Sequence, residues 1–115
     1  MEHSINLNTV KRPTLTVTLM DEENTTLRVK MPDLDMFKEL EEAASMVDDV
    51  EAGKSNTDSV EALYDFLAKT LSCNRDYKTV TADELRGKYG MELEDVILVY
   101  RAYVTFITDV IKEKN

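Results

Sequence analysis

The sequence predicts a single α+β domain in which an N-terminal β-hairpin precedes about four helices, three longer and one short. Apolar and polar residues alternate between positions 14 and 31, whereas from position 33 onward the apolar residues recur every three or four positions. A length of 115 residues also suits one domain. We expect residues 1–13 to be a flexible N-terminal segment. The domain then spans 14–115, with the hairpin at 14–31 and the helical part at 33–114.

The stretch TLTVTLMDEENTTLRVKM is typical of a hairpin with one buried face. Both apolar sets must share that face, so the numbers of paired residues must sum to an even number. A three-residue loop at 22–24 satisfies this condition and puts Asn24 at the left-handed position of the loop, which asparagine tolerates. The expected pairs are Leu19–Leu27, Val17–Val29 and Leu15–Met31.

Start and stop signals divide the helical part. Pro32 ends the second strand, and the first helix runs from there to a left-handed cap at Gly53. The second helix is expected to begin at Asp58, with Asp58 and Glu61 as an acidic capping box, and to be broken by SCNRDYK. A short third helix lies between Thr81, capped together with Glu84, and Gly90, and the long final helix follows from about Glu92.

The final helix has more apolar surface than a core-facing helix usually needs. Its apolar residues fill about half of the circumference, whereas a stripe somewhat over 100° wide is usual. Either the helix packs against the hairpin on one side and other helices on another, or it also contacts a partner, including a second copy. Exposed hairpin edges offer another route to a homo-oligomer, because two strands make a weak sheet. The candidate partner-contact residues are Leu98, Ala102 and Phe106.

The net charge of −9 is concentrated in one part of the chain. Residues 33–62 contain ten acidic side chains and only two basic ones, Lys38 and Lys54. Such a field disfavours nucleic acid and anionic membranes, because phosphate contacts depend on Lys and Arg. Two interpretations stay open: a solvated helix face that keeps the protein soluble, or an acidic regulatory protein that mimics DNA and binds a basic partner.

Residues for catalysis or metal binding are not assembled in any familiar pattern, so we predict no enzyme, metal or cofactor. His3 stands alone near the N-terminus, and Cys73 is the only cysteine. DDVEAG begins like a calcium loop, but Val50 and Ala52 occupy positions where ligands are required. No run is long enough for a membrane span, and the N-terminus lacks the apolar centre of a signal peptide, so we expect a cytoplasmic protein.

The region from 63 to 111 resembles the C-terminal half of the tail assembly chaperones of long-tailed bacteriophages. The strands and the acidic helix also fit that family's layout, which extends the resemblance to roughly 14–112. The family often carries fewer acids than this chain has at 33–51. The features that carry the resemblance are a leucine-rich turn followed by Asn (71–74), a polar connector into a T-x-x-E-L helix (78–85), an L-E-D-hydrophobic helix start (93–96), and an aromatic-x-x-F pattern (Tyr103, Phe106).

The resemblance implies a non-enzymatic factor in viral morphogenesis, encoded by a bacteriophage or prophage. Such chaperones keep the long, mostly helical tape measure protein soluble and help recruit tail tube subunits around it. They act in the bacterial cytoplasm and are absent from the mature virion. Many also exist in a longer form made by ribosomal frameshifting.

Overall fold

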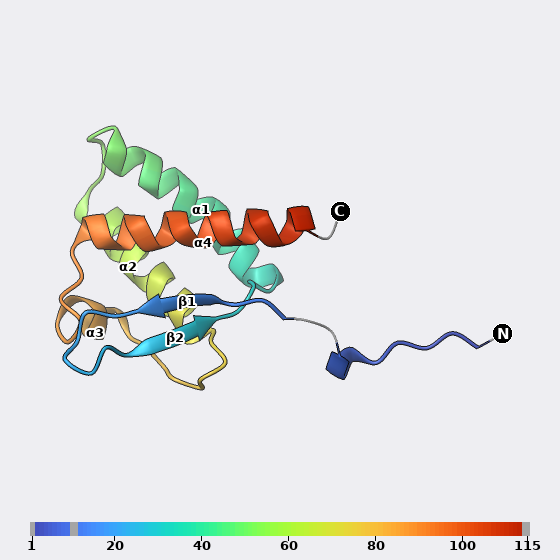
Figure 1. Cartoon of the computed structure of the whole chain (residues 1–115). Coiled ribbons are helices and arrows are strands. Elements are labelled where there is room, and N and C mark those ends of the chain that lie inside the picture. Colours follow the sequence, from blue (N-terminus) through green and yellow to red (C-terminus); the bar gives the residue numbers. More distant parts are fainter. Residues whose placement is uncertain (1, 10–11, 114–115) are drawn as a thin grey trace.

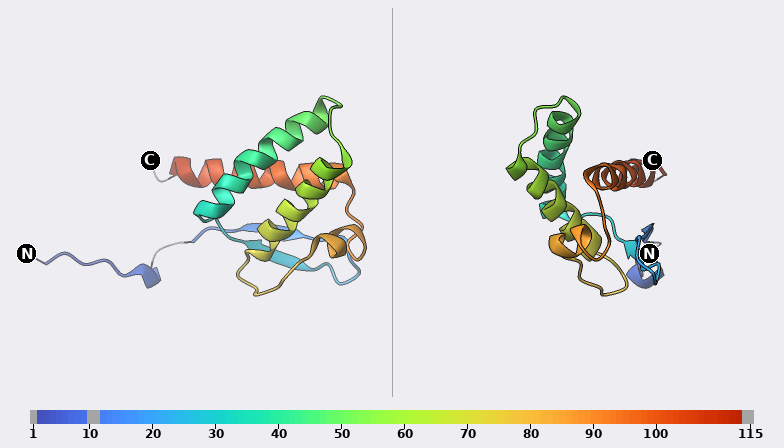
Figure 2. Two further views of the ribbon diagram at one scale, coloured as in Figure 1. Left: turned by 180° about the vertical axis from the view of Figure 1, so that it is seen from behind. Right: turned by 90° about the vertical axis from the view of Figure 1, so that its left-hand side faces the viewer.

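The computed structural model, which describes residues 2–9 and 12–113, has two layers: the hairpin and the last helix form one, and the other three helices form the second (Figures 1 and 2). The predicted fold class, a hairpin followed by three longer helices and one short one in a single domain, is confirmed. A single 3-10 turn, Leu7–Thr9, precedes the hairpin. The elements are β1 (Leu15–Thr18), β2 (Thr26–Val29), α1 (Leu34–Glu51), α2 (Thr57–Ser72), α3 (Ala82–Arg86) and α4 (Leu93–Glu113).

The hairpin has the predicted faces but a different register. β1 and β2 are antiparallel, and Leu15 pairs with Val29 and Val17 with Leu27, so the expected pairing was wrong by two residues. Just beyond the strands, the Leu19 N–H donates to the Thr25 carbonyl at 2.8 Å, and residues 20–24 form the loop.

The side chain of Asp21 fixes this longer loop. Its Oδ1 accepts from the Thr25 main-chain N–H at 2.7 Å and its Oδ2 from the Thr25 hydroxyl, and the hydroxyl bond lowers the pKa of Asp21. Asn24 has φ +50°, as expected for the left-handed position. The predicted faces of the strands are still correct, because a shift of two residues in the pairing keeps every side chain on the same face.

The ends of the first two helices depend on short polar side chains. Asp33 caps α1 by accepting from the Met36 N–H, and Gly53 follows the helix with φ +72°, as predicted. The predicted start of α2 at Asp58 was wrong. Asn56 is the N-cap, and its Oδ1 accepts from the Ser59 N–H at 2.9 Å, which places Asp58 within the first turn. Asparagine is as good an N-cap as aspartate, so the earlier residue takes this position.

The central helix of the fold is α2, not the longer α4. It lies between α1 and the hairpin, and it also contacts α3 and α4 (Figure 2). Its buried side chains therefore point in several directions rather than along one stripe, and they supply much of the core. They are Leu63, Tyr64, Phe66, Leu67, Ala68, Thr70 and Leu71.

The loop after α2 closes the outer edge of β2. Asn74, only 4% exposed, forms an isolated antiparallel bridge with Val29. Its side-chain amide donates to the carbonyls of Leu71 (2.7 Å) and Lys78 (2.8 Å), and its Oδ1 accepts from the N–H groups of Asp76 (2.9 Å) and Lys78 (3.2 Å). One buried side chain thus organises the whole turn. This asparagine is the one that follows the leucine-rich turn in the sequence.

The short helix α3 connects this loop to α4. Thr81 and Glu84 form the predicted capping box. The helix ends at Arg86, earlier than expected, and a turn then leads to Gly90, whose φ is +58°. The Asp95 carboxylate accepts from the Glu92 N–H at 2.9 Å where α4 begins, close to the predicted start.

Candidate functional site

The helix α4 has one face in the core. Tyr103 is 1% exposed at the centre of this face, and its hydroxyl donates to the Lys30 carbonyl at 3.4 Å. Burial raises the pKa of the Tyr103 phenol well above its ordinary value. Val96, Ile107 and Val110 are buried on the same side. This face anchors α4 to the hairpin and α2, so the remaining apolar residues of the helix lie to either side of the core.

The three predicted contact residues lie on the side of α4 that faces β1. Leu98 is 68% exposed, Ala102 is exposed, and Phe106 is half-buried. The Phe106 ring tilts against Tyr103 with 6.3 Å between the ring centroids, so this residue also contributes to the core. Their spacing of four residues places the three side chains in a row along the helix.

Two hollows separate this row from β1. One lies under Leu98 and is bordered by Val17 and Thr18 of the strand, and the other lies beside Ala102 and Phe106 and is bordered by Thr14 and Leu15. We call the two hollows together the β1–α4 groove. Its apolar lining includes Leu15, Val17, Leu98, Ala102 and Phe106, and its acidic lining is Asp95, Asp109 and Glu113.

The main chain of β1 contributes polar groups to this groove, which sequence reasoning missed. Residues that face each other in an antiparallel ladder alternate between hydrogen-bonded and non-bonded pairs. Leu19 and Thr25 are a bonded pair, so Thr16 and Thr18 belong to the non-bonded class. Their N–H and C=O groups therefore point away from β2, toward an edge that has no further strand within the described residues. Only the correct register could have revealed which groups point outward.

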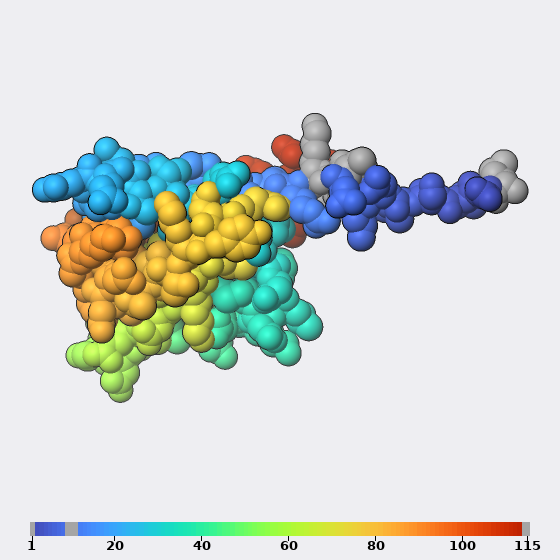
Figure 3. Space-filling view, turned by 90° about the horizontal axis from the view of Figure 1, so that it is seen from below, coloured from blue at the N-terminus to red at the C-terminus, as the bar shows by residue number. Residues whose placement is uncertain are grey.

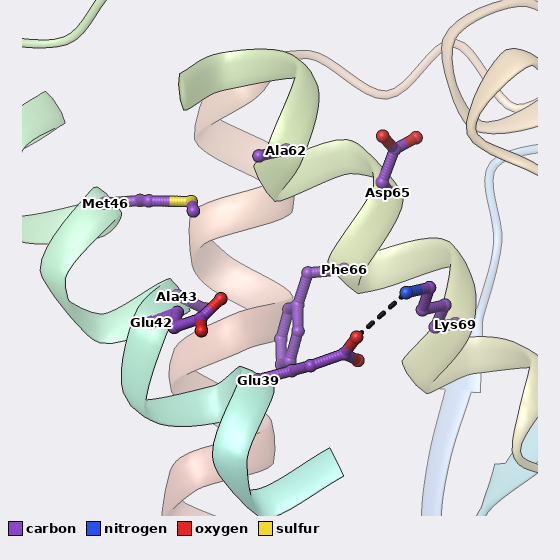
Figure 4. Close-up of a pocket in the computed structure, with 8 residues that line it drawn as sticks. All are labelled: Glu39, Glu42, Ala43, Met46, Ala62, Asp65, Phe66 and Lys69. Carbon is purple, nitrogen blue, oxygen red and sulfur yellow. Dashed lines mark hydrogen bonds and ion pairs between the residues drawn. The ribbon is translucent and has the colours of Figure 1, made fainter. Parts of the chain in front are cut away.

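The acidic part of the chain forms a different surface, between α1 and α2. Figure 4 shows a shallow hollow there, with Phe66 inside it and Glu39 joined to Lys69 across one end at 2.8 Å. Glu51, at the end of α1, is paired with Arg101 of α4. Two of the acids are thus used in ion pairs between helices, while Asp48 and Asp49 stay exposed to solvent.

The groups that usually form a reactive centre lie apart. His3 is exposed in the N-terminal segment, while Cys73 is half-buried at the end of α2. Within residues 2–9 and 12–113, no three His, Cys, Asp or Glu side chains converge closely enough to hold a metal ion. In the same part of the chain, no helix has both the length and the apolar character needed to cross a bilayer.

Comparison with known proteins adds no further information, since no family model, curated protein or solved structure matches this chain.

Proposed function

We propose that this protein is a tail assembly chaperone of a long-tailed bacteriophage or prophage. It acts without catalysis, in the bacterial cytoplasm, by binding the tape measure protein and helping to recruit tail tube subunits. It then leaves before the virion is complete. The proposal rests on the sequence resemblance over roughly 14–112 and on the β1–α4 groove, which offers an apolar surface for a protein partner.

The observation that supports the proposal best is the exposure of Leu98 at the edge of the β1–α4 groove. Leu98 is 68% exposed, so much of its apolar side chain is in contact with water. A partner chain that covered this side chain would remove that apolar surface from water, which favours binding. Ala102 extends the apolar surface along α4, and its small side chain lets a partner approach the helix closely. Amphipathic segments of the kind found in long helical proteins dock on such surfaces through apolar residues at regular spacing.

The acidic lining of the groove indicates the chemistry of the partner. Asp95, Asp109 and Glu113 flank the apolar row, and the whole chain has a net charge of −9. A tape measure segment that carries Lys or Arg beside its apolar residues would therefore be attracted and correctly oriented, whereas an acidic segment would be repelled.

Co-expression with fragments of the tape measure protein from the same genome tests this function. We expect at least one fragment to co-purify with the full chain, and Leu98→Asp to reduce its recovery at least tenfold. Leu34→Asp is the matched control, because Leu34 is 71% exposed on α1, away from the groove. It should bind like the unaltered protein.

Failure of every fragment to co-purify, with the chain folded, would contradict the proposal. Equal loss of binding in both leucine variants would show that exposed leucines in general, and not the groove, determine binding. If instead charge reversal at Asp48 and Asp49 abolished binding to a basic DNA-binding protein, the chain would be an acidic regulator rather than a chaperone.

A further inference from the structure

The two edges of the hairpin differ in a way that points to a missing strand. The outer edge of β2 is occupied, because Lys30 N–H donates to the Cys73 carbonyl (2.9 Å) and Arg75 N–H to the Arg28 carbonyl (2.9 Å). The outer edge of β1 is open at Thr16 and Thr18. An open edge with alternating bonding groups is a template for another extended segment.

The position of α4 restricts what can pair there. Viewed along the strands, α4 lies above β1 (Figure 2). Thr18 lines the hollow under Leu98, and Thr14 lines the hollow beside Ala102. Paired strands lie about 4.8 Å apart, whereas packed helices need about 8–10 Å between their axes. Direct pairing of two copies of β1 would place their two α4 helices side by side over the same face of the sheet, and an extended segment without a helix avoids this crowding. The groove accepts a strand that has no helix above it.

The N-terminal segment of the chain has this character. Its described residues extend away from the rest of the domain, beyond the start of β1, and no other part of the chain lies beside them (Figures 1 and 3). Ile5 is 78% and Leu7 61% exposed, and they alternate with Asn6 and Asn8. A segment with apolar side chains on one face and polar ones on the other matches a groove that is apolar on one side.

We propose that residues 4–8 of a second copy pair antiparallel with β1 and that the two copies exchange these segments reciprocally. Leu7 of the second copy lies opposite Leu15, and Ile5 lies opposite Val17, beneath Leu98, Ala102 and Phe106. Ser4, Asn6 and Asn8 then lie opposite Thr18, Thr16 and Thr14, which are the residues whose main-chain groups face outward. In this register the apolar side chains of the segment and of β1 lie on the same face, and the outward main-chain groups of β1 meet hydrogen-bonding groups of the segment.

The exchange occurs between copies because the segment leaves β1 in the direction away from its own groove (Figure 1). Pairing within one chain would fold residues 4–8 back over β1, whereas the described segment 2–9 extends away from β1 (Figure 1), and in a second copy the turn at Leu7–Thr9 opens to extend the paired segment. Arg12, which follows the paired residues, would come near Asp109 and Glu113 at the end of the neighbouring groove. This pairing does not depend on the proposed function, although a tape measure segment would compete for the same groove.

Disulfide trapping between two variants tests the register. In a Cys73→Ala background, Leu7→Cys chains are mixed with tagged Leu15→Cys chains and oxidised. Opposed non-bonded residues have Cα atoms about 4.5 Å apart, within the range that a disulfide spans. We expect a mixed dimer that contains one chain of each kind. Leu7→Cys mixed with Thr26→Cys, on the far strand, is the control and should give at least tenfold less.

The mass in solution provides a second test with the full chain. We expect the unaltered protein to be a dimer by size exclusion with light scattering, and the variant Ile5→Asp/Leu7→Asp to be a monomer. Asn6→Asp/Asn8→Asp adds the same charge to the opposite face and should stay dimeric. A monomeric unaltered protein, equal behaviour of the two variants, or absence of the mixed disulfide would overturn the proposal.

Discussion

The Asp76 carboxylate accepts hydrogen bonds from the main-chain N–H of Arg28 at 2.8 Å and from its guanidinium at 2.9 and 3.1 Å. A loop residue thus binds both the backbone and the side chain of a strand residue. This contact holds the turn after α2 against β2, beside the bridge between Asn74 and Val29. It also explains why the hairpin is open on one side only, since the loop covers β2 and leaves β1 free.

Asp76→Asn is expected to lower the free energy of unfolding near neutral pH, and the loss should shrink in acid. The hydrogen bonds from Arg28 lower the pKa of Asp76 below its usual 3.8. A lowered folded-state pKa stabilises the protein above the unfolded pKa, and this contribution disappears as the pH falls through the folded value. Urea unfolding at about pH 7 and about pH 3 measures whether the loss is smaller in acid.

The control for this prediction is Asp83→Asn. Asp83 pairs with Arg86 on the surface of α3, where an ion pair contributes little, so its replacement should change stability only slightly. A deficit of the Asp76 variant that is the same at both pH values would mean that the charge on Asp76 is unimportant.

Asn74→Ala should destabilise the fold by about 2–4 kcal/mol, because it removes four hydrogen bonds to buried and partly buried main-chain groups. The four hydrogen bonds of this side chain have no substitute in an alanine variant. Urea unfolding measures the loss. Lys78→Ala is the control, since the exposed Lys78 takes part in the turn only through its main chain. The interpretation of Asn74 as the organiser of the turn fails if the two variants are equally stable.

Asn56→Ala should cost about 1 kcal/mol, the usual loss for removing an N-cap side chain. Asp58→Ala should cost only a few tenths, because an acidic residue in the first turn interacts with the helix dipole alone. Thermal and urea unfolding of both variants would give the order. A larger loss of stability in Asp58→Ala than in Asn56→Ala would indicate that Asp58 is the N-cap, as the predicted capping box of Asp58 and Glu61 requires.

The sequence predicted the elements and their faces well, because both depend on local periodicity. The apolar alternation assigned Leu15, Val17, Leu27 and Val29 to one face, and all four lie toward the core. The register depended on Asp21, whose side chain binds Thr25 and lengthens the loop. Parity cannot distinguish two registers that differ by two residues, so only the three-dimensional contacts of that side chain decide between them.

The candidate site was predictable on the helix but not on the strand. The width of the apolar face of α4 identified Leu98, Ala102 and Phe106, since helical spacing alone places them in a row. What lies opposite them depends on contacts between residues far apart in the sequence. The burial of α2 on several sides could not be read from its main apolar stripe in the sequence, which is Val60, Leu63, Tyr64, Leu67 and Leu71 and omits Phe66 and Thr70.

Thr70→Val should raise the free energy of unfolding by about 1 kcal/mol, because it removes a polar atom that costs energy in the core. Thr70 is 1% exposed, and among the described residues its hydroxyl has no hydrogen-bond partner. Valine keeps nearly the same shape. Thr70→Ser is the opposite control, since it keeps the hydroxyl and removes a methyl group, and should lower stability. A valine variant less stable than the natural chain would indicate a partner for the hydroxyl.

The two faces of α4 should respond very differently to substitution. Tyr103→Ala removes a ring that is 1% exposed and should cost roughly 3–5 kcal/mol, because the surrounding core cannot fill the space. In the monomeric Ile5→Asp/Leu7→Asp background, Leu98→Asp changes a side chain that is 68% exposed and should alter stability by about 0.5 kcal/mol or less. Urea unfolding of the two variants measures the contrast. A large loss at Leu98 would make this side of α4 part of the core, and the groove beside β1 could no longer be interpreted as a surface kept for another chain.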